Sequence, residues 1–530
     1  MTSYEKRTIR CVSAFIVLLA CALVSVQAAQ YKRNHQGPII QMTKGHDEKA
    51  LNKLEKYRKQ HPDESETYYC LALAYARTGQ MEKAMQSVHE ALERGLPFGR
   101  FLAGPKSLAK PLLESEQFQK LAEKKDIELI HGPMVSDVTD TTAEFWARTA
   151  HRVPMRVLVS TKKNMESAIR SVAVKAESAR GSTTVARVEG LEPDTRYYCK
   201  LLLSGEEHPG QWSFRTYPEA RFPGDFDVGF GGGAGFTPWY ERMWNTVAAR
   251  DLRAFLFLGD NVYIDYPKDS DVQRYTYYRR QSVPEYRNFI ARTSIYAIWD
   301  DHDFCTNDSG GGPKIDEPDW KMPVWRVFMN QWNNPYYAGG QDQPGCWFDF
   351  SIADVDFFML DGRYYRTGAK VDHPSMLGPA QKEWLFKKLK ASDATFKVIA
   401  SPVPWAYGSK PGSNDPWQGY KEERKEIFDF LHENKIEGVF LISADRHRSD
   451  VWKIERENGY PLWEFESSKL TNVHTHGKMK GSLFSYNDKC SFGELAFDTT
   501  MANPRVTYKI FSIDGELIHR HTVQRSELTY

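Results

Sequence analysis

Three short apolar runs that end abruptly in acidic or polar residues most constrain how this chain folds. The runs and the tips that follow them are residues 254–258 with 259–263, 294–299 with 300–303, and 438–442 with 443–447. Apolar runs of this length between helical stretches are typical of buried strands in an α/β domain. Because ligands bind beyond the carboxyl ends of such strands, the sequence predicts that the three tips meet.

The residue types at these tips indicate a metal centre. They offer Asp260 and Tyr263, then the Asp300-Asp301-His302-Asp303 run, then Asp445 and His447. Several carboxylates at close range repel one another unless a cation neutralises them. Carboxylate and phenol oxygens with imidazole suit hard or borderline cations. Each tip alone has a plain structural explanation, such as a helix cap, but three in one chain favour a metal site.

Charge and hydropathy exclude several classes of protein. The 530 residues contain 70 Lys and Arg against 69 Asp and Glu, a net charge of +1. No overall field attracts nucleic acid or an anionic membrane, so any recognition of phosphate must be local. The mean hydropathy of -0.57 excludes a polytopic membrane protein. The length leaves room for about three domains.

The N-terminus has the features of a secretory signal peptide. Basic residues precede an apolar run over residues 11–26, and Val26 and Ala28 are small at the positions that a signal peptidase reads. We therefore predict a signal peptide over residues 1–28, a periplasmic or secreted protein, and no membrane span in the mature chain. A single membrane anchor and lipoprotein cleavage at Cys21 are the alternatives.

Cysteine spacing gives no disulfide framework. Removal of residues 1–28 leaves Cys70, Cys199, Cys305, Cys346 and Cys490, which are far apart and form no Cys-x-x-Cys pair. One disulfide is possible, and the sequence does not choose its partners.

Residues 40–125 are predicted to be a short α-helical segment of tetratricopeptide type. Ala50 and Leu54 recur as Ala84 and Val88 at the spacing of about 34 residues that is typical of this repeat. Fewer than two repeats are visible, too few for an independent solenoid. The segment is either an arm that binds a protein partner or a helical cap packed on the next domain.

Residues 126–217 change to the alternating pattern of half-buried strands. The strands are expected over residues 142–148, 155–160, 183–188 and 196–203. The stretch from Leu191 to Tyr197 resembles the tyrosine corner of fibronectin type III domains. The sequence thus predicts a β-sandwich, followed by an α/β domain over residues 225–530, with helices at 240–249, 380–391 and 421–434 among its elements.

The motifs of the last domain resemble those of a known enzyme family. In order, they are Leu258-Gly259-Asp260-x-x-Tyr263, Trp299-Asp300-Asp301-His302-Asp303, Leu360-Asp361-Gly362-Arg363 and Ser443-Ala444-Asp445-Arg446-His447. This series is similar to that of the PhoD-like alkaline phosphatases, a branch of the calcineurin-like metallophosphoesterases. A sandwich ahead of the catalytic domain is also typical of the family. The resemblance covers about residues 126–530 and implies a metallophosphoesterase-like catalytic domain.

The resemblance implies roles for individual residues. Metal ligands would be Asp260, Tyr263, Asp300, Asp301, Asp445 and His447, and the metals would be Fe3+ and Ca2+. His302 would donate a proton to the leaving group. Apart from the resemblance, the position of Arg363 after Asp361 at a strand end predicts that it clamps the phosphate and takes part in catalysis, and Arg446 is expected to bind substrate in the same way. For both arginines a salt bridge to a nearby acid is the alternative, and His474 and His476 either touch a metal or lie exposed in a loop.

One departure from the family pattern affects the metals. Gly233 stands near the position of the cysteine that binds iron in the family. A thiolate ligand is therefore absent, and other divalent metals are possible.

The predicted function is a secreted, metal-dependent phosphatase of alkaline phosphatase type. It hydrolyses phosphate esters with a metal-activated water and has possible phosphodiesterase activity. The competing interpretation is a catalytically decayed scaffold that binds partners through its helices and sandwich. A third is a related hydrolase acting on another ester, such as a sulfate.

Overall fold

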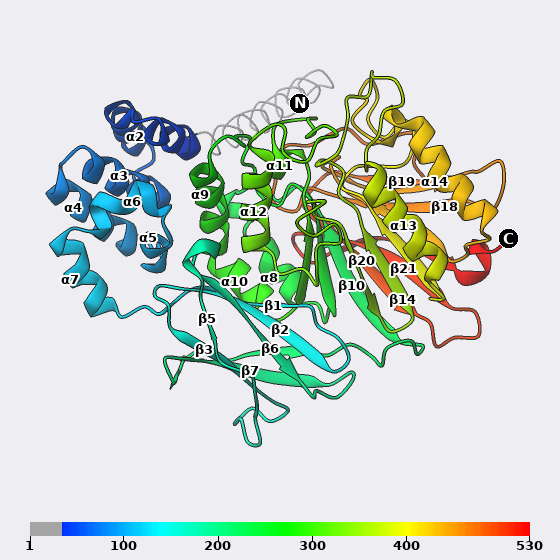
Figure 1. Ribbon diagram of the computed structural model, residues 1–530, viewed down its shortest axis with the longest axis horizontal. Helices are drawn as coiled ribbons and strands as arrows, with labels where there is room; N and C mark the ends of the chain where they lie inside the picture. Colours follow the sequence, from blue (N-terminus) through cyan, green and yellow to red (C-terminus); the bar gives the residue numbers. More distant parts are fainter. Residues whose placement is uncertain (1–33) are drawn as a thin grey trace, which may run out of the picture.

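The computed structural model describes residues 34–530, so the predicted signal peptide lies outside the described residues. Figure 1 shows three parts in chain order: helices, a pair of small sheets, and a larger part in which two sheets are flanked by helices. The helices lie beside the larger part and the small sheets lie below both in this view. No helix within residues 34–530 is long and apolar enough to cross a membrane.

The N-terminal helices pack around α3. Residues 34–43 are helical, and the helices that follow are α2 (Asp47–Gln60), α3 (Ser65–Arg77), α4 (Met81–Glu93), α5 (Gly99–Ala103), α6 (Lys106–Leu113) and α7 (Glu116–Lys125). Every residue of α3 from Glu66 to Ala76 is buried. Alanines in this stretch allow α2, α4 and α6 to approach it closely.

These helices are fixed to the larger part through α9 (Ser270–Gln281). The Cys70 sulfur lies 3.8 Å from the Tyr275 hydroxyl. The Arg100 guanidinium lies 5.1 Å from the centre of the same ring and pairs with Glu66 at 3.1 Å. All four side chains are buried, so the helices form a cap on the larger part.

Two antiparallel sheets follow. One has the order β1-β2-β6 and the other β4-β3-β7-β8, with β5 on β3 and β9 on β7. Their strands are β1 (Leu129–Ser136), β2 (Thr142–Thr149), β3 (Pro154–Ser160), β4 (Ile169–Arg170), β5 (Val174–Lys175), β6 (Thr183–Glu189), β7 (Arg196–Leu203), β8 (Glu206–Glu207) and β9 (Trp212–Arg215). Phe145 meets Phe214 between the sheets at 5.3 Å. The Glu192 N–H donates to the Tyr197 hydroxyl at 2.9 Å, which is the contact of a tyrosine corner.

The larger part contains a six-stranded and a seven-stranded sheet. The first has the order β12 (Ser294–Ile298), β11 (Ala254–Leu258), β10 (Asp225–Gly231), β20 (Ser491–Asp498), β21 (Arg505–Ser512) and β22 (Leu517–Gln524). The second has the order β13 (Phe348–Ile352), β14 (Val355–Met359), β15 (Phe396–Ala400), β16 (Val439–Ser443), β18 (Leu462–Ser467), β17 (Ser449–Ile454) and β19 (Phe484–Tyr486). Strands β10 to β12 are parallel, as are β14, β15, β16 and β18.

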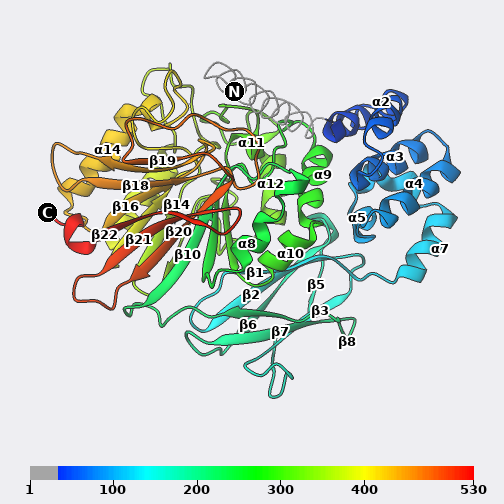
Figure 2. The same ribbon diagram turned by 180° about the vertical axis from the view of Figure 1, so that it is seen from behind.

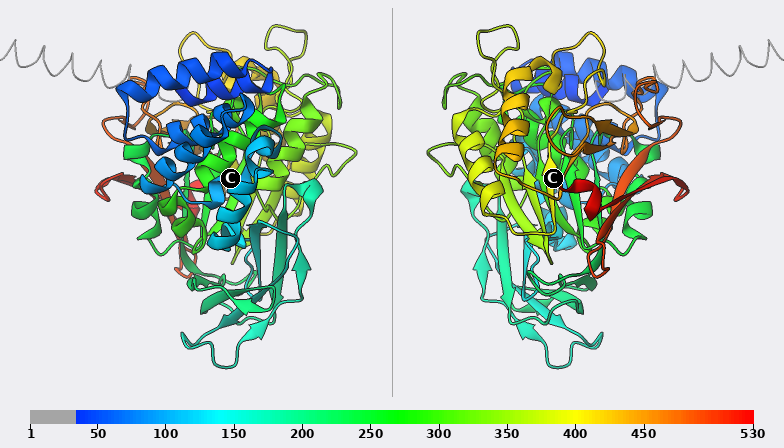
Figure 3. Two further views of the ribbon diagram at one scale, coloured as in Figure 1. Left: turned by 90° about the vertical axis from the view of Figure 1, so that its left-hand side faces the viewer. Right: turned by 90° about the vertical axis from the view of Figure 1, so that its right-hand side faces the viewer.

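The two sheets face each other and helices cover their outer faces (Figure 2). Phe497 of β20 lies 5.9 Å from Phe357 of β14 and 6.2 Å from Phe440 of β16. The covering helices are α8 (Met243–Ala248), α9, α10 (Pro284–Ile290) and α12 (Lys321–Gln331) on one side and α13 (Pro379–Ala391) and α14 (Lys421–Glu433) on the other. The side views of Figure 3 show the same layers edge on.

The strands expected within residues 142–203 agree closely with β2, β3, β6 and β7 of the structure. The helix expected over residues 240–249 is shorter, because a 3-10 turn ends at Tyr240 before α8 begins at Met243. The possible disulfide is not formed, since the five cysteines of the described residues are all free. Cys305 is half-buried, and the other four are buried.

Candidate metal centre

The tip after β11 requires glycine at its first position. Gly259 has a φ of 101°, and a Cβ there would lie 2.5 Å from the Asp300 Cβ. Only a residue without a side chain permits this approach. Asp260 follows with a φ of 53°, so the backbone turns sharply and brings its carboxylate beside the tip of β12.

Asp303 holds these two tips together. Its carboxylate accepts hydrogen bonds from the backbone N–H groups of Asn261 at 3.1 Å, Val262 at 3.0 Å and Asp300 at 3.1 Å. Burial raises the pKa of Asp303 to about 7, although these hydrogen bonds oppose the shift. Asp303 is thus a scaffold for the site, and its neighbours carry the free ligand atoms.

The tip after β16 reaches the same place. Asp445 and His447 have φ values of 67° and 49°. The Tyr263 hydroxyl donates to Asp260 Oδ2 at 2.8 Å and lies 3.2 Å from His447 Nε2, which is itself 4.0 Å from Asp260 Oδ2. Burial, with the Asp260 carboxylate adding to it, raises the pKa of Tyr263 well above its usual value. The phenol therefore remains the donor.

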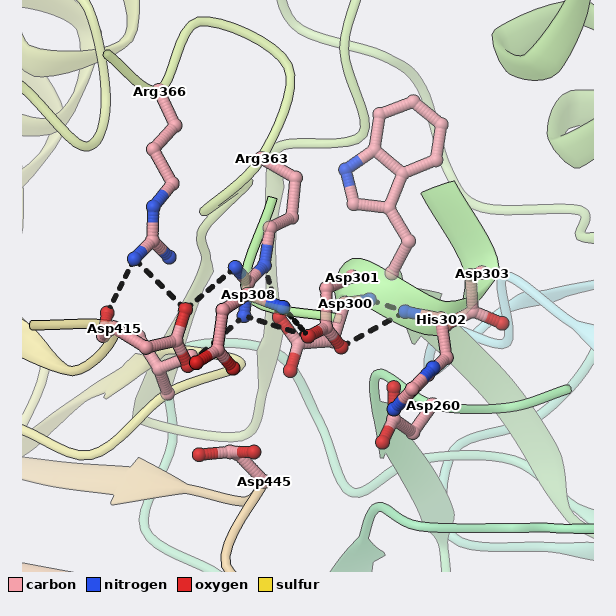
Figure 4. A network of polar contacts seen from close by, with 12 residues as sticks. Asp260, Asp300, Asp301, His302, Asp303, Asp308, Arg363, Arg366, Asp415 and Asp445 are labelled. Atoms are coloured by element: carbon pink, nitrogen blue, oxygen red, sulfur yellow. Dashed lines mark hydrogen bonds and ion pairs between the residues drawn. The ribbon is translucent and has the colours of Figure 1, made fainter. Parts of the chain in front are cut away.

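The tip after β14 supplies a buried cation. Arg363 Nε lies 2.5 Å from Asp300 Oδ1, Nη1 lies 2.8 Å from Asp415, and Nη2 lies 3.9 Å from Asp301 Oδ2. The guanidinium is wholly buried, and Figure 4 shows it between these carboxylates. Burial alone raises the pKa of Asp415, but Arg363 and Arg366 more than offset this, so the pKa lies well below its usual value.

His302 is held by a carboxylate of its own. Asp265 accepts a hydrogen bond from His302 Nδ1. A carboxylate on one ring nitrogen fixes the tautomer and leaves Nε2 with its lone pair available. Such a histidine is suited either to bind a metal or to exchange a proton with a substrate.

Several ligand atoms at this site suit a cation. Atoms of Asp260, Asp301 and His302 lie within 4.8 Å of one another. Asp260 Oδ1 and Asp300 Oδ2 are buried and have no hydrogen-bond partner within residues 34–530. Burial, with repulsion from Asp301 adding to it, raises the pKa of Asp260 to about 8. A cation would satisfy these oxygens and remove the repulsion, so the residues fit the metal centre that the sequence predicts.

Comparisons with known proteins agree with this geometry. The family described as PhoD-like phosphatase matches residues 229–525, and its N-terminal domain matches residues 115–218. The chain belongs to the PhoD-like phosphatase family. Alkaline phosphatase D of Bacillus subtilis (strain 168) is 22% identical over 346 residues, which are 56% of this chain and 58% of that protein. The chain therefore spans somewhat over half the length of this curated relative.

Two solved structures share the fold. One is described as the structure of PhoD, with a TM-score of 0.63 and 16% identity over 74% of this chain and 90% of that one. The other is the purple acid phosphatase PPD1 of yellow lupin (Lupinus luteus), with a TM-score of 0.55 and 11% identity over 75% of each chain. At these identities the likeness concerns the fold alone.

Within this PhoD-like chain, most of the predicted site residues meet at the strand ends, whereas the two predicted arginines form ion pairs with carboxylates of that group. Seven predicted residues surround one place at the strand ends, and Figure 4 draws most of them. They are Asp260, Tyr263, Asp300, Asp301, His302, Asp445 and His447. Arg446 is buried and lies 3.3 Å from Asp445. The predicted phosphate-binding role of Arg363 stays a prediction, while its contacts favour a role in holding Asp300 and Asp301 in place.

Two loop histidines lie beside His447, and of these His474 is exposed and His476 is half-buried. The rings of His474 and His476 lie 5.1 Å and 5.4 Å from that of His447, and His447 Nδ1 lies 3.0 Å from the His474 carbonyl oxygen. Burial lowers the pKa of His476 to about 3, and nearby Arg446 and His474 add to this. All three imidazoles are thus neutral near pH 7, which is the form that binds metals.

Sequence reasoning missed three functional neighbours. Asp265 lies two residues beyond Tyr263, and that proximity was an available signal. Lys410 and Asp415 lie in a loop rich in Gly, Pro and Ser and gave no pattern. Yet Lys410 lies 2.9 Å from Asp415 and 3.5 Å from Asp445, so it connects the arginine cluster to the tip of β16.

Gly233 is confined by its surroundings. Its φ is 67°, and a Cβ there would lie 2.9 Å from the Lys469 backbone nitrogen and 3.0 Å from Ser468 Oγ. The next residue, Ala234, donates its N–H to the Asp260 carbonyl oxygen at 2.8 Å. The backbone here is fitted to glycine and holds the Asp260 turn, and no side chain from this position reaches the centre.

Proposed function

We propose that this protein is a metal-dependent phosphatase that hydrolyses phosphate esters. The observation that carries the proposal is the convergence of Asp260, Asp301 and His302 at strand ends, with buried carboxylate oxygens that have no donor in the described residues. Membership of the PhoD-like phosphatase family supports the same activity.

The cofactors are a pair of metal ions at the strand ends. When bound, the metal ions would activate water and neutralise phosphate oxygens. The residues that would hold them are Asp260, Tyr263, Asp300, Asp301, Asp445 and His447. Fe3+ and Ca2+ are the pair that we propose first, because the resemblance to PhoD-like phosphatases implies them and oxygen-rich ligands are compatible with hard cations. With no thiolate at Gly233, other divalent pairs fit the same donors.

The residues of the chain would divide the remaining work. His302, oriented by Asp265, would give a proton to the departing alkoxide through Nε2. Arg363 would offset the effect of burial on Asp301, whose pKa lies below its usual value, and would hold Asp300 in place. Arg446 would lie where it can meet a phosphate oxygen beside Asp445. No covalent intermediate on the protein is needed.

The wider setting is also part of the proposal. We propose an exported protein of alkaline phosphatase type, with a signal peptide over residues 1–28 and diesterase activity as a secondary property. Its domains would be the helical segment (40–125), the sandwich (126–217) and the catalytic domain (225–530). The matched family ranges, 115–218 and 229–525, lie close to the last two of these.

The test is hydrolysis of nitrophenyl phosphate by protein loaded with metals and by chelator-treated protein. We expect hydrolysis that the chelator abolishes and that the metals restore. Asp445→Asn should remove most of it, because Asp445 lies at the convergence of the tips, while Asp498→Asn on the far end of β20 should not. A folded, metal-loaded protein that hydrolyses no phosphate ester would favour the decayed scaffold instead, and hydrolysis of a sulfate ester alone would favour the third interpretation.

A further inference from the structure

A cleft beside the metal centre is bounded by residues from two distant parts of the chain. It has a volume of about 620 Å³ and is lined by Asp265, His302, Thr306 and Asn307 on one side and by Gln36, Gly37, Ile40 and Lys53 on the other. His302 belongs both to this cleft and to the cluster with Asp260 and Asp301. The cleft therefore lies beside the metal-binding cluster and shares His302 with it.

The wall formed by the N-terminal helices is held firmly against the catalytic loop. The Gln36 side-chain amide donates to the carbonyl oxygen of Tyr263 at 3.2 Å and to that of Ile264. Gln36 is buried, and the His35 side chain next to it lies 2.8 Å from Thr67 Oγ1 of α3. The wall is thus a built feature that continues the anchoring of the helices on α9.

Lys53 gives this wall a positive charge. The side chain is exposed, and no carboxylate within residues 34–530 forms an ion pair with it. Its ammonium lies over Gly37, where a Cβ would meet Nζ at 2.9 Å, so the absence of a side chain at position 37 leaves room for the amine. The acidic group opposite, Asp265, is already paired with His302. Lys53 is therefore the cationic group of the cleft lining, and among the described residues it forms no ion pair.

We propose that this cleft binds the alcohol part of the ester and that Lys53 selects esters whose alcohol part carries a second anionic group. The inference rests on the proposed phosphatase function and adds a substrate class to it. With the phosphorus at the metal centre, the departing alkoxide faces His302, and the group attached to it enters the cleft. Thr306 and Asn307 also line the cleft and add a hydroxyl and a carboxamide as hydrogen-bond donors.

The helical wall lies outside the part of the chain that the family models match. The family matches cover residues 115–218 and 229–525, and Gln36, Gly37, Ile40 and Lys53 all lie outside them. A specificity determinant in this position would distinguish this protein from relatives with the same metal-binding tips.

The experiment compares kcat/KM for two alkyl esters, propyl phosphate and 1,3-propanediol bisphosphate, by release of inorganic phosphate. The bisphosphate carries the second anion and the monophosphate does not. The measured quantity is the ratio of the two kcat/KM values in each variant, so chelation of metal by the bisphosphate affects all variants alike. Lys59→Ala is the matched control, because Lys59 is an exposed lysine on the same helix that does not line the cleft.

The ratio is kcat/KM for the bisphosphate divided by kcat/KM for propyl phosphate. We expect Lys53→Ala to lower it about 3- to 10-fold and Lys53→Glu to lower it further. Lys53→Arg and Lys59→Ala should leave it within about 2-fold of wild type. Added salt should lower the ratio in wild type more than in Lys53→Ala, because the charge pair is screened. An unchanged ratio in both Lys53→Ala and Lys53→Glu would overturn the cleft assignment and leave the phosphatase proposal intact. Wild-type protein that hydrolyses nitrophenyl phosphate but neither alkyl ester would overturn the cleft assignment alone, and hydrolysis of none of the three would overturn both.

Discussion

The buried arginine of the site gives the sharpest prediction. Arg363→Met keeps an unbranched side chain but removes the charge from between Asp300, Asp301 and Asp415. Asp415 keeps Arg366 at 2.8 Å and Lys410 at 2.9 Å, whereas among the described residues Asp300 pairs with Arg363 alone. Loss of one partner of a buried ion pair costs about 3–5 kcal/mol. At ~2 °C per kcal/mol for a domain of this size, the melting temperature should fall by roughly 6–10 °C.

Thermal unfolding followed by tryptophan fluorescence measures this effect, with and without a chelator. Arg505→Ala is the control, because Arg505 forms an exposed ion pair with Asp498 at 3.4 Å and should change stability by less than about 0.5 kcal/mol. Adding Asp300→Asn to Arg363→Met removes the stranded carboxylate and should recover part of the loss. An unchanged melting temperature with a raised KM alone would refute this reasoning and make Arg363 a phosphate ligand.

Three further predictions concern neighbouring groups. Tyr263→Phe removes the 2.8 Å hydrogen bond to Asp260, and kcat for nitrophenyl phosphate should fall about 10-fold while KM stays near the wild-type value; an unchanged kcat would contradict this. Asp265→Asn leaves His302 without its orienting carboxylate, so hydrolysis of an alkyl phosphate should fall more than that of nitrophenyl phosphate, whose leaving group needs less protonation; equal losses would contradict it. Burial lowers the pKa of His35 to about 3, and Arg279 and His61 add to this. Below about pH 6.5 the unfolded chain therefore binds a proton that the folded chain does not, and stability should fall by ~1.4 kcal/mol per pH unit; His35→Asn should show a shallower fall in urea titrations at pH 7 and 5.5.

The core of the site was predictable because strand ends leave a signal in the sequence. The run at residues 254–258 coincides with β11, and the run at 438–442 differs from β16 by one residue. Parallel pairing then brings the side chains that follow to one edge of each sheet. Asp260, Asp301 and Asp445 were therefore found without knowledge of the tertiary structure.

What the sequence could not supply was the pairing between remote side chains. The sequence around Arg363 is compatible with two roles, a phosphate clamp and a salt bridge. Only the positions of Asp300 and Asp415 around its guanidinium favour the salt bridge. The docking of Gln36 on the loop after Tyr263 had no local signal either, because a buried side-chain amide looks like any polar residue of a helix. Contacts of this kind depend on how the domains pack, which the pattern of one chain does not encode.

Elemental analysis of the purified protein tests the central claim most directly. We predict about two metal equivalents per chain in wild type, and at most about one in Asp260→Ala, with hydrolysis of nitrophenyl phosphate lost in parallel. A metal content in folded Asp260→Ala equal to that of wild type, or full hydrolysis by protein shown to be free of metal, would contradict the shared centre at the strand ends.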